Sequence, residues 1–180
     1  PNYLILYVDL SEVAPQTFNI TLKKGKKTTN VPYELKQRRP NSSEVKGFDA
    51  SDVLYLIMPD RFANGDESND SVECMADKLA RERKSGRHGG DIQGVIDHLD
   101  YISELGATYI WTTPFLADNA PRGSYHGYAA SDYYHIDPRF GSNELYRTLV
   151  AKANEKGLGI IMDMVPNHCG TEHWWMEDLP

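Results

Sequence analysis

From residue 52 onward, short apolar segments that predict strands alternate with segments whose apolar spacing predicts helices. No other feature of the sequence constrains the fold as much. The expected strands are residues 53–58, 108–112 and 158–165, each apolar with β-branched or aromatic side chains. Parallel strands need a long crossover, usually a helix, whereas antiparallel strands can be joined by a tight turn. The sequence therefore predicts an α/β fold with a parallel sheet.

Two helices are expected between these strands. Residues 92–105 carry apolar side chains at positions 92, 95, 96, 99, 102 and 105, on one face of a helix, and Gly106 follows as a C-terminal cap. Ser142 is expected to cap the second helix, and Gly157 to end it. Three such strands with long insertions predict the first third of a (β/α)₈ TIM barrel. A doubly wound sheet is the alternative, but no glycine-rich phosphate loop follows the first strand.

The residues before this region have the pattern of an all-β domain. Residues 3–10 are apolar and strand-like, and residues 17–22 and 30–35 flank a basic turn around Gly25. A polar, linker-like stretch follows them.

We therefore predict two domains. Residues 1–45 are expected to be the C-terminal strands of an N-terminal, immunoglobulin-like β-sandwich domain. Residues 46–180 are expected to be the N-terminal part of the barrel, ending at the start of a loop domain after its third strand. Because the chain begins inside a strand-like run, we also expect its true N-terminus to be missing.

The composition argues against two classes of partner. The 180 residues carry a formal net charge of −7, so we expect no nucleic-acid partner, which would need clustered Lys and Arg. The longest apolar stretches are too short to cross a bilayer, so we expect no membrane span. Cys74 and Cys169 have neither metal-ligand spacing nor the density of a disulfide framework. We expect both to be free.

Polar residues after the first expected strand can be interpreted in two ways. In a barrel, function lies where strands end at their carboxyl side. Asn64, Asp66, Asn69 and Asp70 surround the flexible Gly65, and such oxygens could converge on Ca²⁺, which takes about six to eight oxygen ligands. The alternative is a solvated turn, for which the same residue types are typical.

The ends of the second and third strands carry aromatic and hydrogen-bonding residues. His126 and Tyr128 lie in the loop after the second strand, and Asp163, Asn167 and His168 follow the third. Aromatic faces beside hydrogen-bonding groups suit pyranose rings, which present C–H faces and hydroxyl rims. The alternatives are tyrosines buried for stability and a histidine satisfied within the structure.

These segments, in this order, resemble the alpha-amylase family, especially its neopullulanase, cyclomaltodextrinase and maltogenic amylase branch. The resemblance covers about residues 50–180. It is carried by Tyr125-His126-Gly127-Tyr128, Asp132-Tyr133-Tyr134, Ile136-Asp137, Phe140-Gly141 and Asp163-Met164-Val165-Pro166-Asn167-His168, with Gly89-Gly90-Asp91, Gly94 and Trp111. It implies a retaining α-glucan hydrolase that cleaves α-1,4 bonds in starch, pullulan or cyclodextrins.

The resemblance also implies roles for individual residues. Tyr128 would stack on the sugar ring at the cleavage site, and His126 and His168 would bind its hydroxyls. Asp163 would brace the site, and Asn167 would be a metal or structural ligand. The implied calcium site comprises Asn64, Asp66, Asn69 and Asp70, joined by the Gly89 carbonyl and by Asp91.

The sequence departs from the family pattern in two respects. Ala129 stands where many members have Trp after the tyrosine, which leaves the substrate preference open. The family's nucleophile and acid/base carboxylates are expected beyond Pro180, so the chain alone is expected to be inactive. A homodimer is one assembly that the full-length protein could form. The alternative function is a non-catalytic amylase-like barrel that serves as a binding or scaffolding module.

Overall fold

The computed structural model describes residues 4–44 and 46–177. The chain divides into two compact units, residues 1–47 and 48–180, and each is described by itself. No helix in the described ranges is long and apolar enough to span a membrane.

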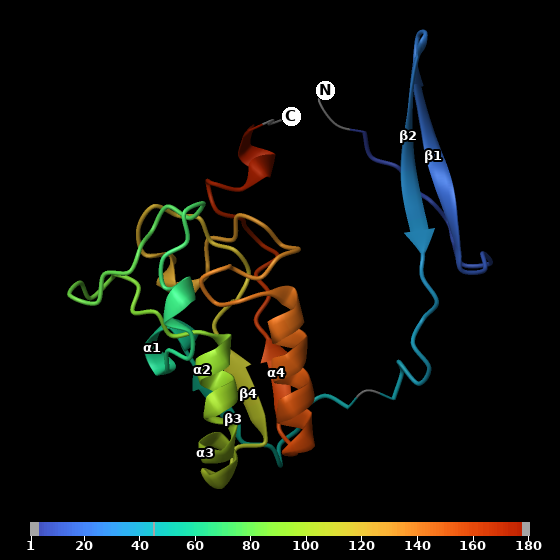
Figure 1. Ribbon diagram of the computed structural model, residues 1–180. Coiled ribbons are helices and arrows are strands. Elements are labelled where there is room, and N and C mark those ends of the chain that lie inside the picture. The colour runs from blue at the N-terminus through green and yellow to red at the C-terminus, as the bar shows by residue number, and fades with distance from the viewer. Residues whose placement is uncertain (1–3, 45, 178–180) are drawn as a thin grey trace. The chain divides into compact units, whose positions relative to one another are not determined.

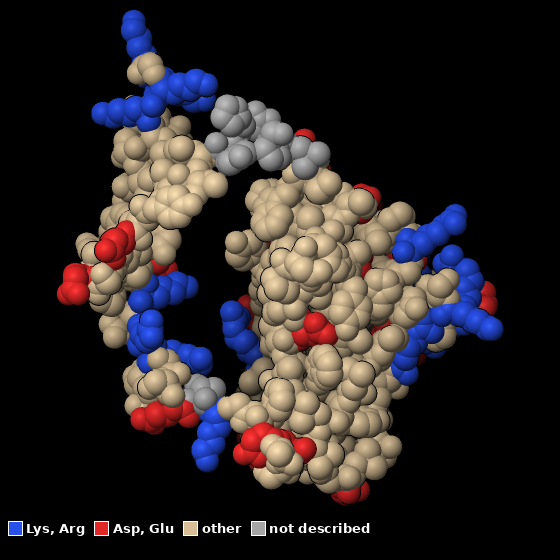
Figure 2. All heavy atoms as spheres, turned by 180° about the vertical axis from the view of Figure 1, so that it is seen from behind, with Lys and Arg blue, Asp and Glu red and all other residues tan. Residues whose placement is uncertain are grey.

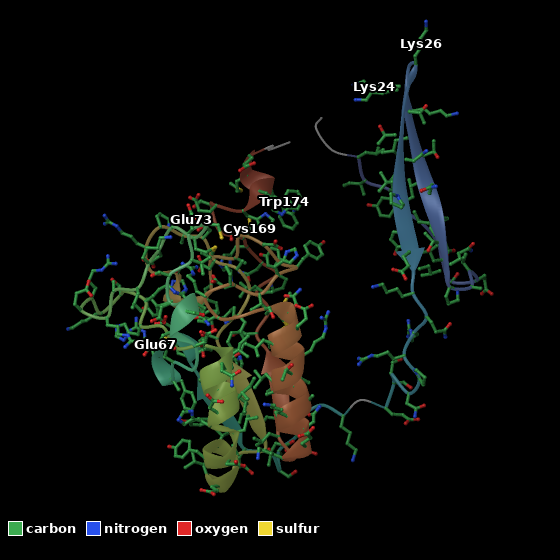
Figure 3. The ribbon with its side chains drawn as sticks, in the orientation of Figure 1. Lys24, Lys26, Glu67, Glu73, Cys169 and Trp174 are labelled. Atoms are coloured by element: carbon green, nitrogen blue, oxygen red, sulfur yellow. The ribbon has the colours of Figure 1, made fainter. Side chains whose placement is uncertain are left out.

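The first unit contains one antiparallel hairpin, formed by β1 (Gln16–Lys24) and β2 (Lys27–Leu35) (Figure 1). The predicted hairpin is confirmed, but its strands run closer to the turn than expected. Gly25 has a left-handed φ of 61° at the turn, a conformation that glycine adopts without steric cost. Lysines flank this turn, and Lys24 and Lys26 extend outward from the tip (Figures 2 and 3).

The prediction of a strand over residues 3–10 is wrong for residues 4–10, and residue 3 lies outside the described ranges. Residues 4–9 are exposed, and Tyr7 is almost fully so. A strand is stabilised by pairing with a neighbour, and this segment has none in the described part of the chain.

The second unit is built on a parallel sheet in the order β3-β4-β5, which confirms the predicted α/β pairing. Its strands are β3 (Leu54–Ile57), β4 (Tyr109–Thr112) and β5 (Gly159–Met162). Its helices are α1 (Pro59–Phe62), α2 (Ile92–Asp97), α3 (Leu99–Glu104) and α4 (Asn143–Glu155). Short 3₁₀ helices are η1 (Glu67–Asn69), η2 (Ser124–His126) and η3 (Trp174–Glu177).

The predicted helix over residues 92–105 is two helices, because the chain leaves helical geometry at His98. His98 has φ −111° and ψ 15°. Its ring atom Nδ1 lies 2.8 Å from the Gly94 carbonyl oxygen, which the His98 backbone N–H would bind in a continuous helix. The side chain therefore competes with the helix for this acceptor. By contrast, α4 follows the prediction, and the Ser142 hydroxyl accepts the Leu145 N–H at 3.0 Å.

The two faces of the parallel sheet differ in burial. Ile57 and Ile110 lie in the hydrophobic core, together with buried residues of α2, α3 and α4. On the opposite face, Leu56 is 58% exposed and Trp111 37% exposed, and Figure 2 shows a largely uncharged surface on the side of this unit turned away from the viewer in Figure 1. The nearly continuous apolar run of residues 158–165 predicts a strand buried on both faces. This prediction is wrong within this chain: β5 ends at Met162, which is 38% exposed.

Candidate functional site

The predicted site residues of the second unit lie in loops that gather above the carboxyl ends of β3, β4 and β5 (Figure 1). In parallel barrels this edge carries the active site. The loop after β4 contains η2 and carries His126 and Tyr128, whereas the segment after β5 carries Asp163, Asn167 and His168.

The η2 turn is fixed by its two flanking glycines. Gly123 and Gly127 have φ values of 76° and 77°, in the left-handed region that glycine populates readily. A side chain at Gly127 would also clash with the carbonyl oxygen of Pro114. The loop can therefore lie directly on the chain at the end of β4, which brings His126 and Tyr128 to the edge of the sheet.

The structure brings His126, Tyr128 and His168 together. The backbone N–H of Tyr128 donates to His126 Nδ1 at 2.9 Å, and the two rings lie 5.8 Å apart. His168 Nε2 lies 2.9 Å from the Tyr128 carbonyl oxygen and so donates to it. His126 Nδ1 accepts a hydrogen bond, so the proton of the neutral ring lies on Nε2, which can donate to a ligand.

His168 uses both ring nitrogens within the protein. Its Nε2 binds Tyr128, and its Nδ1 lies 3.0 Å from Asn167 Nδ2. In this arrangement His168 fixes the backbone of Tyr128, and Asn167 fixes the ring of His168. The hydrogen-bonding atom that this trio offers to a ligand is therefore His126 Nε2.

Asp163 joins the loop after β4 to the end of β5. Its Oδ2 atom accepts the Tyr128 hydroxyl at 2.9 Å and the Trp111 indole N–H at 3.2 Å. Burial and the contact with Asp163 raise the pKa of the Tyr128 hydroxyl, because the anion would lose the hydrogen bond and lie beside a carboxylate. Tyr128 is therefore a neutral donor to Asp163, and 37% of it remains exposed.

A groove of about 460 Å³ adjoins these residues. Its walls are aromatic and apolar, with amide and imidazole groups at one side; it is lined by Tyr133, Tyr134, Met164, Pro166, Asn167, His168, Cys169 and Trp175. His168 belongs to both the groove and the trio, whereas His126 and Tyr128 do not line the groove. Figure 3 shows Cys169 among these loops, and both cysteines are free, as expected.

Sequence reasoning missed a set of buried charged residues beneath the η2 loop. The Ser124 backbone N–H and hydroxyl both donate to Asp77 Oδ2 at 3.2 Å, and Arg87 Nη1 donates to the Ser124 carbonyl oxygen at 3.3 Å. Asp118 accepts the Ala129 N–H at the other end of the loop, at 3.1 Å. The available signal was weak: Asp118 directly follows the apolar run Pro114–Ala117, where a buried charge needs partners.

The loop after β3 is organised by Asp91, the N-cap of α2. Asp91 Oδ1 accepts the N–H groups of Gly65 and Gly94 at 3.0 and 2.6 Å. Its Oδ2 accepts the Asp66 N–H at 2.9 Å and the Asn69 amide at 3.0 Å. Asp66 in turn accepts from Ser68, which lowers the pKa of Asp66. The carboxylates of Asp66 and Asp91 therefore already hold the loop together.

The remaining residues of this loop fit a hard cation. Asn64 Oδ1 and Asn69 Oδ1 are buried without a hydrogen-bond partner in the described part of the chain, which is costly unless a ligand satisfies them. The Asn64 amide N–H donates to Asp70 Oδ1 at 2.7 Å. A side chain at Gly89 would clash with Asp70 Oδ1, so its backbone lies against this group.

Few carboxylates are available to a cation in the loop after β3. No group of three or more His, Cys, Asp or Glu within the described ranges is placed to hold a metal. Burial raises the pKa of Asp70, with Arg81 opposing the shift. A cation here would therefore be held by amide and carbonyl oxygens with one carboxylate, a donor set typical of calcium rather than of zinc.

Comparison with known proteins identifies the family. The family profile described as "Alpha amylase, catalytic domain" matches residues 56–179, and the one described as "Cyclomaltodextrinase, N-terminal" matches residues 1–39. The chain belongs to the alpha-amylase family. This confirms the predicted fold class, in which part of the amylase barrel follows a β-rich N-terminal segment.

Curated relatives narrow the comparison. Neopullulanase 2 of Thermoactinomyces vulgaris is 45% identical over 129 residues, which are 71% of this chain and 21% of the relative. A cyclomaltodextrinase of Geobacillus thermopakistaniensis is 42% identical over 127 residues, again 71% of this chain and 21% of the relative. The chain thus spans about a fifth of the length of these relatives.

A solved structure supports the same assignment. The alpha-amylase of Geobacillus thermoleovorans, determined in complex with acarbose, has a TM-score of 0.56 and 38% sequence identity. The match covers 71% of this chain and 25% of that one.

Proposed function

We propose that this chain is the N-terminal part of a retaining α-glucan hydrolase that cleaves α-1,4 glucosidic bonds in starch, pullulan or cyclodextrins. The observation that carries the proposal is the convergence of His126, Tyr128 and His168, with Asp163 behind them, at the carboxyl ends of adjacent parallel strands. The relatives named neopullulanase and cyclomaltodextrinase support the substrate class.

In this proposal, the site residues of this chain bind and orient one glucose unit. The Tyr128 ring offers an apolar face to the C–H face of a pyranose. His126 Nε2 donates to a hydroxyl of that ring, and this bond strengthens as the ring acquires oxocarbenium character. Asp163 holds the Tyr128 hydroxyl, and His168 holds the Tyr128 carbonyl oxygen. These contacts fix the ring before the sugar arrives, which reduces the cost of ordering it.

Bond cleavage needs two further carboxyl groups. In a retaining hydrolase one carboxylate attacks the anomeric carbon while an acid protonates the leaving oxygen, with the two groups about 5–5.5 Å apart. We assign neither role to Asp163, because its contacts are to Tyr128 and Trp111. We infer that both groups lie after later strands of the whole protein, beyond Pro180.

The test is release of reducing ends from soluble starch and cyclodextrins by the full-length protein. His126→Ala should lower kcat/KM by about tenfold or more, as expected for a hydrogen bond that strengthens in the transition state. His135→Ala is the matched control, since His135 is exposed and, among the described residues, its ring pairs only with Asp132. No turnover by the wild type, with maltotriose binding retained, would identify a non-catalytic binding module instead.

We also propose that the loop after β3 binds calcium. Asn64, Asn69, Asp70 and the Gly89 carbonyl would be the ligands, and Asp66 and Asp91 would hold the loop around them. The partnerless amide oxygens of Asn64 and Asn69 support this assignment. The ion would neutralise the partly buried Asp70 carboxylate. Chelation with EDTA should lower the melting temperature of the full-length protein, and an unchanged melting temperature would remove the assignment.

A further inference from the structure

In the loop after β4, the peptide group between Tyr128 and Ala129 is hydrogen-bonded at both its carbonyl oxygen and its N–H. The Tyr128 carbonyl oxygen accepts the His168 Nε2–H at 2.9 Å, and the N–H of the same peptide, which belongs to Ala129, donates to Asp118 Oδ2 at 3.1 Å. His126 accepts the N–H that precedes the Tyr128 side chain. The backbone on both sides of Tyr128 is therefore fixed by three side chains, of which Asp118 alone is fully buried.

Asp118 is itself rigidly anchored. Its backbone N–H donates to Asp137 Oδ2 at 3.1 Å, and its carbonyl oxygen accepts Arg139 Nη2 at 2.6 Å. Asp137 and Arg139 form a buried ion pair of 2.7 Å. The carboxylate of Asp118 thus extends from a fixed main chain, so that its position determines where the Ala129 N–H can lie.

Burial of the Asp118 carboxylate costs folding free energy. The hydrogen bonds that it accepts come from the neutral backbone N–H groups of Ala120 and Ala129. Burial raises the pKa of Asp118, and these hydrogen bonds offset the shift only in part. A buried carboxylate without full compensation destabilises the folded state. Such a group is better explained by what it orients than by a contribution to stability.

We propose that Asp118 is a positioning residue that sets the orientation of Tyr128 toward the sugar. The identity of the ligand as a sugar rests on the proposed function. The hydrogen bonds that connect Asp118 to Tyr128 do not depend on it. Asp118 acts through the Tyr128–Ala129 peptide and does not contact the sugar.

The role proposed for Asp118 requires a carboxylate, because both of its side-chain oxygens accept a backbone N–H. Asp118 Oδ1 binds the Ala120 N–H at 3.0 Å while Oδ2 binds the Ala129 N–H. An asparagine has one acceptor oxygen and one donor NH₂ group at these positions. Asp118→Asn can therefore satisfy one of the two N–H groups, and its NH₂ would face the other. Asp118→Ala leaves both N–H groups without this acceptor.

The test uses the full-length protein with maltotriose as the probe. Asp118→Ala should weaken maltotriose affinity by about tenfold, the lower end of what loss of a charge-assisted hydrogen bond gives. In a Tyr128→Ala background the same change should alter affinity by less than about twofold, because residues that act as one unit are not additive. A merely structural loss would be equal in both backgrounds, and that result would overturn the proposal.

A second measurement separates this proposal from the proposed function. In a crystal structure of the Asp118→Ala protein, the Tyr128 hydroxyl should leave Asp163 and the Ala129 N–H should rotate away from position 118. An unchanged contact between Tyr128 and Asp163 would overturn the positioning role, whether or not maltotriose binds. Asp52→Asn is the stability control: Asp52 binds Thr108 at the opposite end of the sheet, so its change should leave maltotriose affinity unaltered. If the wild type binds no maltotriose, the proposed function fails while the crystallographic comparison still decides the role of Asp118.

Discussion

The loops after β3 and β4 lie at the same edge of the sheet, but they satisfy their polar groups differently. Beneath the loop after β4, Asp118 and the Asp137–Arg139 pair hold the chain through hydrogen bonds within the protein. In the loop after β3, Asn64 and Asn69 each keep a buried amide oxygen without a partner in the described ranges. Buried polar groups are normally paired. Asp118, Asp137 and Arg139 are therefore paired within the protein, although Arg87 Nε and Nη2 beneath the same loop lack a hydrogen-bond partner in the described ranges. Under the calcium proposal, the ion would satisfy the amide oxygens of the loop after β3.

This difference separates two ways of building a site. The loop after β4 has its interior filled by the protein and presents Tyr128 and His126 outward, so a sugar would bind on a surface that is already formed. The loop after β3 points its oxygens inward, so an ion would complete its interior. Loss of a ligand should affect stability in the second case and little in the first.

The largest effect is expected from Arg139→Ala, which breaks the interior of the loop after β4. It leaves Asp137 buried without its cation, and such a loss costs about 3–5 kcal/mol of unfolding free energy. Denaturant unfolding of the full-length protein measures it. Arg147→Ala removes an exposed pair with Glu144 and should change stability little. Equal effects of the two changes would show that the buried network does not support this loop.

The calcium response should distinguish the loop after β3. With calcium at about 100 times its dissociation constant, the wild type should gain about 2.7 kcal/mol of stability. Asn69→Ala should lose most of this gain. In EDTA it should lose only about 1 kcal/mol, from the hydrogen bond that its amide N–H donates to Asp91, because the amide oxygen it removes is unpaired without the ion. Thermal melts with and without calcium measure both. Asn154→Ala, an exposed change on α4, should respond as the wild type does; a full calcium response in Asn69→Ala would contradict the assignment.

The smallest effect concerns pH and Asp118. Burial raises the pKa of Asp118 above its ordinary value. A group with a raised folded pKa contributes stability below its unfolded pKa, and that contribution is lost as pH rises through the folded pKa. Asp118→Asn has no such titration, so the wild type should lose stability relative to it as pH rises. The neighbours Asp137, Arg139 and His126 are common to both proteins.

Melting temperatures of these two proteins between about pH 3 and pH 7 span the ordinary range of carboxyl titration. Curves that run parallel across this range would show that the Asp118 carboxyl does not carry the raised pKa.

Much of this architecture could be predicted from sequence because its signals are local. The three strands and α4 follow from apolar spacing and from the Ser142 cap. The break at His98 depends on a ring nitrogen competing for the Gly94 carbonyl oxygen, which periodicity does not report. The segment 4–10 resembles a strand in composition, but strand formation needs a partner.

In the candidate site, too, some residues could be predicted from the sequence and others could not. His126, Tyr128 and His168 could be named because each follows a strand whose carboxyl end lies at one edge. Asp118 could not, because its partner Ala129 is 11 residues away and meets it only when the loop folds back. The three hydrogen bonds that tie Asp91 to the loop after β3 likewise come from residues more than 20 positions away.

The most direct test of this account is a crystal structure of the full-length protein with maltotriose. We expect one glucose unit to stack on the Tyr128 ring, with one of its hydroxyls within about 3.2 Å of His126 Nε2, a normal hydrogen-bond distance. Maltotriose bound elsewhere, with Tyr128 and His126 free of contact, would contradict the proposed site.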